Sequence, residues 1–281
     1  MSGKLYVCAT PIGNLKDITL RCLETLKEVD LIASEDTRHT IKLLNHYEIK
    51  TPLESYHEHN KDTKGKKLLN LLQQGKNIAL VSDAGMPGIC DPGEDLIKLC
   101  YENGVEVTVL PGATASVTAL ILSGIKTRSY CFEGFLPSNK KAKKDVINRL
   151  KDDTRTYIFY EAPHHLLQTL KEINTQIGNR NISIVKEITK KYENVFKTNL
   201  TDAITYFTQN EPKGEYVLVI EGANEEDLLN KQKEEIQNLT IQQHFNQYIT
   251  QGFEEKEAMK KVAKDRGISK RDVYNEIKIS K

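Results

Sequence analysis

Long apolar runs are missing from this 281-residue chain. No window approaches the ~18 consecutive apolar residues that a membrane-spanning helix requires. The first residues pass directly into a strand-like run, so we also expect no secretory signal. Basic and acidic residues nearly cancel, at 40 and 39, so an anionic partner must be held by a local basic patch and not by net charge. These absences predict a cytoplasmic protein without a membrane partner.

Cysteine is scarce and scattered. The chain has five, and none of them forms a C-x-x-C pair: Cys8, Cys22, Cys90, Cys100 and Cys131. This pattern favours reduced, mostly buried thiols over a disulfide framework or a zinc site. No other metal-ligand spacing is present, so we expect no metal. Two nucleotide motifs are also missing, the P-loop and a G-x-G-x-x-G after the first strand, which argues against both of these sites.

The order of apolar runs predicts the fold class. Up to residue 123, short apolar runs without polar alternation alternate with helical patterns, which indicates parallel βαβ units. After a break at Gly124, a second α/β set with a mixed sheet is expected over 124–223. Residues 224–281 are charged and helical, and Gly267 separates two short helices as in a helix-turn-helix, or as in a plain helical hairpin. We therefore expect an α/β protein with domains at 1–123 and 124–223 and a small helical tail.

The most informative segment is 82–93, SDAGMPGICDPG, which follows the apolar run 78–81 and precedes a helical pattern. Its glycines let the backbone approach a ligand closely. The helix start supplies unpaired N–H groups and a positive dipole end, and Asp83 can accept hydrogen bonds from hydroxyls or an amine. An ordinary βα connection with two tight turns explains the loop alone equally well.

Four further polar segments follow predicted strands: 10–14, 34–38, 110–116, and 160–165 together with 187–193. Because ligands bind at the carboxyl ends of strands in open α/β sheets, these loops are expected to converge. Small residues after Thr114 leave room for a bulky ligand such as a purine. The alternative is structural: Asp36 or Thr37 caps one helix and Thr114 caps another.

Six segments in this order resemble the ribosomal RNA small subunit methyltransferase I family of the tetrapyrrole methylase superfamily: 10–14, 34–38, 82–93, 133–137, 160–164 and 187–190. The resemblance covers about residues 4–222, and the helical tail also fits that family. Two positions depart from it. Met86 stands where the family usually has threonine, and His165 stands where it usually has arginine. The first change removes a hydroxyl near the cofactor, and the second removes a fixed positive charge.

The resemblance implies a class III methyltransferase fold that binds S-adenosylmethionine between its two domains. It also implies a homodimer, and methylation of the 2′-hydroxyl of a cytidine in the decoding region of 16S ribosomal RNA, within the small ribosomal subunit. The cofactor contacts that it implies are Asp83, Ala84, Gly85, Met86, Thr114, Ala115, Glu161 and Ala162.

That chemistry assigns two further functions to side chains. A ribose hydroxyl is a poor nucleophile at neutral pH, so a proton acceptor would assist it. The candidates are Asp36, Lys190, Glu35 and Glu187, and the lysine would serve only with a lowered pKa. RNA phosphates are expected to contact a basic run, unless that run is only a solvated helix face. The run comprises Lys140, Lys141, Lys143, Lys144 and Arg149.

Two other functions stay open. One is carbon methylation of a corrin-type macrocycle by another member of the superfamily, which the six matching segments and the lysine-bearing tail disfavour. The other is a non-catalytic RNA-binding assembly factor, which would have no affinity for S-adenosylmethionine. The concentration of polar residues at strand ends argues against a purely structural protein.

Overall fold

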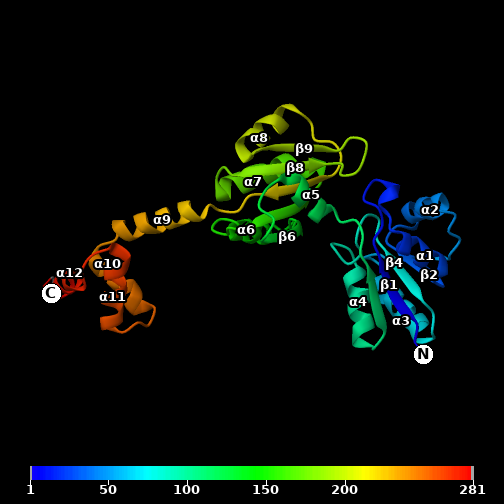
Figure 1. The fold of residues 1–281 in the computed structure, drawn as a ribbon, viewed down its shortest axis with the longest axis horizontal. Coiled ribbons are helices and arrows are strands. Elements are labelled where there is room, and N and C mark those ends of the chain that lie inside the picture. The colour runs from blue at the N-terminus through cyan, green and yellow to red at the C-terminus, as the bar shows by residue number, and fades with distance from the viewer. Residues whose placement is uncertain (1, 280–281) are drawn as a thin grey trace. The chain divides into compact units, whose positions relative to one another are not determined.

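The computed structural model describes residues 2–279 and divides into two compact units (Figure 1). The first unit covers the chain up to Lys151 together with residues 155–222. The second comprises residues 152–154 and the chain from Ala223 onward. Both predicted sheets lie in the first unit, and the helical tail forms most of the second.

The N-terminal sheet is entirely parallel, with the order β3-β2-β4-β1-β5. Its strands are β1 (Lys4–Cys8), β2 (Leu31–Ser34), β3 (Leu53–Ser55), β4 (Ile78–Val81) and β5 (Glu106–Leu110). The connecting helices are η1 (Leu15–Asp17), α1 (Leu20–Glu28), α2 (Thr37–His46), α3 (Lys61–Gln73) and α4 (Gly93–Glu102). The parallel sheet predicted from unalternating apolar runs is confirmed.

Alternate strand residues bury two separate cores. Leu5 and Ile78 pack with residues of α3 and α4 on one face. Cys8 and Ala79 pack with residues of α1 and α2 on the other. Each large aliphatic side chain that is fully buried stabilises the fold by roughly 1.5–3 kcal/mol. Because all five strands run the same way, the loops that leave their carboxyl ends meet at one edge of the sheet.

The second sheet is mixed, as predicted, with the order β6-β7-β10-β8-β9. Only β6 and β7 run parallel, and the other neighbouring pairs are antiparallel. The strands are β6 (Tyr130–Phe135), β7 (Thr156–Glu161), β8 (Asn181–Lys186), β9 (Asn194–Asn199) and β10 (Tyr216–Ile220). The helices are α5 (Ala115–Ser123), α6 (Lys140–Arg149), α7 (Pro163–Ile177) and α8 (Leu200–Gln209).

Helix α5 joins the two sheets. Its residues Ala119 and Leu120 pack on Ile158 and Val217 of the second sheet, whereas α6, α7 and α8 bury the opposite face. The expected domain boundary at residue 124 therefore comes after a helix that covers the second sheet. A helix so placed brings the loop at its own N-terminus close to both sheets.

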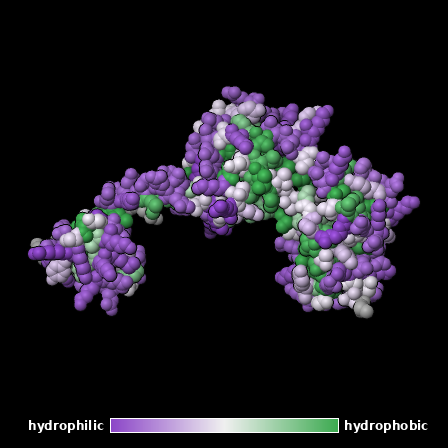
Figure 2. Space-filling model, in the orientation of Figure 1, coloured by the Kyte–Doolittle hydropathy of each residue, from purple (hydrophilic) through white to green (hydrophobic). Residues whose placement is uncertain are grey.

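The tail contains α9 (Glu225–Asn238), α10 (Ile241–Thr250), α11 (Glu255–Arg266) and α12 (Lys270–Ile279). Phe245, Met259 and Val273 belong to a small core between the last three helices. Gly267 ends α11 in the left-handed conformation, with φ of 66°. The visible surface of these helices is mostly hydrophilic (Figure 2). Within residues 2–279, every helix is too short or too polar to cross a bilayer.

Candidate functional site

The loop after β4 is held against the loop after β1. Thr10 and Gly85 exchange two backbone hydrogen bonds, of 2.9 and 3.1 Å. The Thr10 hydroxyl also donates to the Ser82 carbonyl at 3.1 Å. Gly85 has φ of +83°, and a Cβ there would lie 3.3 Å from the Ala113 carbonyl oxygen. This position therefore requires glycine, and three of the predicted loops meet around it.

Asp91 organises the rest of this loop. Its carboxylate accepts hydrogen bonds from the Gly88 amide at 2.9 Å and from the Gly93 amide at 2.7 Å. The buried Tyr56 hydroxyl donates to the Pro92 carbonyl at 3.1 Å. The far half of the loop is thus fixed by contacts of Asp91 and Tyr56.

The start of α5 lacks the side-chain cap that the structural interpretation of Thr114 requires. Thr114 occupies the N-cap position, but its side chain makes no capping hydrogen bond. The N–H groups of the first turn thus receive no acceptor from that side chain. Ala115 is small, and Ser116 is buried.

Glu35 and Asp36 come directly after β2 and differ in electrostatic environment. Burial, and then the carboxylates of Asp83 and Asp91, raise the pKa of the Glu35 carboxyl. Asp36 caps α2 and pairs with the Arg38 guanidinium at 2.7 Å. These bonds lower the pKa of Asp36 to about 2. The Asp36 amide donates to Asp83 at 3.0 Å, so the loops after β2 and β4 are in direct contact.

The candidates after β8 form an ion-pair cluster. The Lys190 ammonium lies 2.7 Å from Glu215 and 3.2 Å from Glu187. Burial lowers the pKa of Lys190, but these two carboxylates outweigh it and the net shift is upward. For Glu187, burial raises the pKa, yet the Glu215 amide and Lys190 lower it overall. Lys190 is therefore a cation at neutral pH, and Glu187 is its counter-ion.

This cluster packs directly against the loop after β1. The Asn14 amide donates to the Thr189 hydroxyl at 3.1 Å. A Cβ at Gly13 would lie 2.5 Å from Cγ of Lys190. On β7, the nearly buried Glu161 accepts a hydrogen bond from the Ala162 amide at 2.9 Å. The structure thus joins the predicted loops 10–14, 82–86, 110–116 and 187–190 through contacts.

The basic run occupies α6 and is only partly available to a partner. Lys143 pairs with Glu172 at 2.7 Å and Arg149 pairs with Glu133 at 3.2 Å. Lys140, Lys141 and Lys144 are exposed, and their spacing places them within about 100° of one another around the helix. These three are the members of the run free of an ion pair within the described part of the chain.

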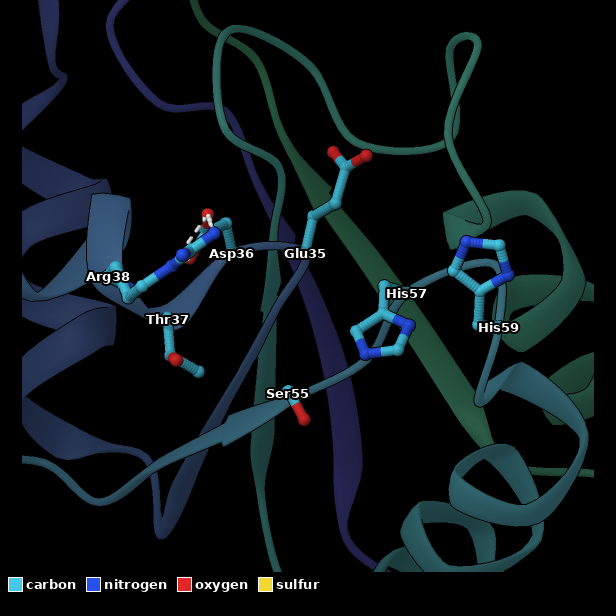
Figure 3. Close-up of a pocket in the computed structure, with 7 residues that line it drawn as sticks. All are labelled: Glu35, Asp36, Thr37, Arg38, Ser55, His57 and His59. Carbon is cyan, nitrogen blue, oxygen red and sulfur yellow. Dashed lines mark hydrogen bonds and ion pairs between the residues drawn. The ribbon is translucent and has the colours of Figure 1, made fainter.

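A hollow of about 310 Å³ opens beside Glu35, at the ends of β2 and β3 (Figure 3). Its lining comprises Glu35, Asp36, Thr37, Arg38, Ser55, His57 and His59. The last three come from a strand and loop that the sequence reasoning missed, because β3 has only three residues. The sequence did contain a signal for this part of the lining: His57 and His59 closely follow Ser55, the last residue of a strand.

Comparison with known proteins gives a consistent result. A family model described as Tetrapyrrole (Corrin/Porphyrin) Methylases matches residues 4–204. The chain is 50% identical over 275 residues to the Ribosomal RNA small subunit methyltransferase I of Halalkalibacterium halodurans, covering 97% of this chain and 94% of that one. It is 48% identical over 273 residues to the protein of the same name from Bacillus subtilis, covering 97% and 93%.

Solved structures share the fold at low sequence identity. The methyltransferase CobJ superposes with a TM-score of 0.61 at 18% identity, covering 79% of this chain and 95% of that one. The uroporphyrin-III-C-methyltransferase of Thermus thermophilus gives a TM-score of 0.56 at 17% identity, covering 77% and 94%. These likenesses confirm the predicted fold class.

Proposed function

The chain belongs to the tetrapyrrole (corrin/porphyrin) methylase family, and from this membership we propose that it methylates the ribose 2′-hydroxyl of a cytidine in 16S ribosomal RNA. It is an S-adenosylmethionine-dependent methyltransferase. Relatives that are 45–50% identical over 97% of the chain carry the name of small subunit ribosomal RNA methyltransferases. The high identity to these relatives supports RNA as the substrate. The methyltransferase CobJ, at 18% identity, shares only the fold with this chain and does not support a macrocycle.

The residues at the sheet edge fit this methyl donor. The sharp turn at Gly85 exposes backbone beside the uncapped first turn of α5. The small side chains of Ala84 and Ala115 leave room for a purine, and Asp83 and Glu161 offer acceptors for hydroxyls or an amine. Met86 packs partly against the first core, where it supports the loop with apolar contacts. When bound, the donor supplies an electrophilic methyl group on a sulfonium sulfur.

Glu35 is the proton acceptor that we favour among the four candidates. A general base works best when its pKa lies near the working pH, and Glu35 is the candidate carboxyl whose pKa is raised. Asp36 is held ionised by Arg38, and Lys190 is held protonated by Glu187 and Glu215. A base of this kind contributes ~10²–10⁴-fold in rate. Alignment of the reacting groups and exclusion of water contribute more, up to roughly 7–11 kcal/mol.

Contacts with RNA are assigned to Lys140, Lys141 and Lys144. Lys143 and Arg149 hold α6 in place through their ion pairs. We also propose a homodimer that acts in the cytoplasm on assembled small subunits. Val109, Val117 and Ile121 are exposed apolar residues of β5 and α5, typical of a surface that another copy covers.

The decisive experiment uses small ribosomal subunits from cells that lack this protein. Purified protein and labelled S-adenosylmethionine should add one methyl group per 16S RNA, and mapping should place it on the 2′-oxygen of a cytidine. Labelling of a precorrin with no labelling of subunits would favour the macrocycle. Absence of S-adenosylmethionine binding in a calorimetric titration would favour the non-catalytic assembly factor.

A further inference from the structure

The hollow beside Glu35 has not yet been assigned a ligand. Its volume, about 310 Å³, lies at the small end of the range for ligand pockets. It opens at the carboxyl ends of two parallel strands, where such sheets bind ligands. Through the bond from the Asp36 amide to Asp83, it adjoins the loop that we assign to the methyl donor.

The charges of the lining favour a ligand that donates hydrogen bonds. The guanidinium of Arg38 is paired with the Asp36 carboxylate by three hydrogen bonds, which Nε and Nη2 donate. Glu35 has no such cation within the described residues, and Asp83 and Asp91 lie close enough to raise its pKa. A phosphate group would be repelled by this surplus of carboxylates. Hydroxyls or amines would find acceptors there.

His57 is held in place with one ring nitrogen unused. The Asn60 Oδ1 accepts from the His57 amide at 2.9 Å, so its Nδ2 must be the donor to His57 Nε2 at 3.2 Å. In the neutral ring the proton therefore lies on Nδ1. Among the described residues, that Nδ1 is buried without a hydrogen-bond partner. An unpartnered N–H on a residue that lines a hollow requires an explanation, and a small movement of the ring would let it donate to a ligand there.

The second imidazole completes one wall. The ring centroids of His57 and His59 lie 6.0 Å apart, and Figure 3 shows both rings on the same loop after β3, away from the Arg38–Asp36 pair. Histidine rings are among the side chains on which unstacked RNA bases stack. Tyr56, between Ser55 and His57, is buried and bonded to Pro92, which anchors this wall to the cofactor loop.

We propose that the hollow receives the target nucleoside of the RNA, turned out of its helix, with the ribose toward Glu35 and the base beside His57 and His59. This inference rests on the proposed function. In this arrangement His57 and His59 position the base. The phosphates remain outside the hollow, and the lysines of α6 bind the RNA backbone. Enzymes that modify a base act on single-stranded RNA or turn the nucleotide out of its helix, and a ribose hydroxyl that must enter a hollow makes the same demand.

The test compares three single variants with the wild-type protein. His57→Ala and His59→Ala remove the wall, and His46→Ala removes an exposed histidine of α2 that does not line the hollow. His59 is exposed, so its alanine variant loses no buried packing and folds even if His57→Ala does not. The measurements are the Kd for S-adenosylmethionine by calorimetry and kcat and KM with unmethylated small subunits.

We expect KM for subunits to rise roughly 10- to 100-fold in both variants of the wall, as for the loss of one base-stacking contact. The Kd for S-adenosylmethionine should stay within a factor of about 2, since the wall does not form the donor site. His59→Phe should restore much of the loss, because phenylalanine also stacks on bases. His46→Ala should behave as wild type.

Two results would overturn the inference. Equal weakening of S-adenosylmethionine binding would make the hollow part of the donor site, and an unchanged KM in His59→Ala would leave the base elsewhere. Wild-type protein that binds the donor but methylates no subunit would instead contradict the proposed function itself, and the inference with it.

Discussion

The loop edge of the parallel sheet and helix α6 of the mixed sheet carry opposite charge. The carboxylates of Asp83 and Asp91 lie near Glu35 at the first, and three exposed lysines lie on the second. A parallel sheet sends the loops after all its strands to one edge, so acids from distant segments meet there. A mixed sheet divides its loops between two edges. The contrast suggests that chemistry belongs to the first region and attraction of the RNA backbone to the second.

Glu35→Gln tests whether the loop edge of the parallel sheet supplies the proton acceptor, and it has the largest expected effect. The amide keeps the shape of the side chain but cannot take a proton, so kcat should fall ~10²–10⁴-fold. The Kd for S-adenosylmethionine should hardly change. Single-turnover methylation of small subunits measures the loss. A kcat near that of wild type would show that Glu35 is not the base. Either another candidate would then take the proton, or alignment of the reacting groups would be the main source of the rate.

The same substitution makes a prediction about folding. The pKa of Glu35 lies above its usual 4.5 in the folded protein, so the native state binds this proton more tightly than the unfolded state. Its contribution to stability is present below about pH 4.5 and is lost as pH rises through the folded-state pKa. At pH 7.5, Glu35→Gln should therefore melt at or above the wild-type temperature. A clearly lower Tm would contradict the crowding of carboxylates.

Gly85→Ala tests whether the loop geometry serves the donor. Left-handed backbone in a residue other than glycine costs roughly 1–3 kcal/mol, and the new Cβ would also press on Ile12 and Ala113. We expect the Kd for S-adenosylmethionine to rise about 10-fold or more. Gly104→Ala is the matched control, since Gly104 has φ of +67° but no neighbour within 4 Å among the described residues. Similar affinities in the two variants would exclude a special role for Gly85.

Charge reversal of the three exposed α6 lysines tests whether α6 attracts the RNA backbone. Lys140→Glu, Lys141→Glu and Lys144→Glu together should weaken subunit binding and reduce the slope of log K against log salt by about 2 to 3. Turnover at saturating subunit concentration should stay close to wild type. Lys27, Lys66 and Lys98, exposed lysines of the first unit, provide a control triple variant. An equal loss in that control would indicate a general charge effect.

Ile121→Glu should have the smallest effect on the chemistry. The substitution places a charge on the exposed face of α5, where Ile121 is 67% exposed, and should convert the proposed dimer into monomers. Light scattering after size-exclusion chromatography measures the mass. A monomeric wild-type protein would remove the dimer from the proposal without touching the contrast between the two regions.

Periodicity and glycine placement carried most of the structural information in the sequence. Unalternating apolar runs identified the parallel sheet, and the glycine pattern of 82–93 identified a loop whose turn does need Gly85. Neither signal could show that Asp36 and Lys190 are held charged in ion pairs, because the pairing with Arg38 and Glu215 depends on side-chain geometry. The wall of His57 and His59 was missed as well, because β3 is too short to give a periodic signal.

Arg266 gives the tail a mechanical property. Its guanidinium bonds the carbonyls of Ile236 and Leu239 at the end of α9, and its Nε bonds His244 of α10. One side chain of α11 thus fastens the last turn of α9 to α10 and α11, and the small core that contains Val273 adds α12. The last turn of α9 and helices α10–α12 should therefore move as one body, because a displacement between them would break these hydrogen bonds or open the small core.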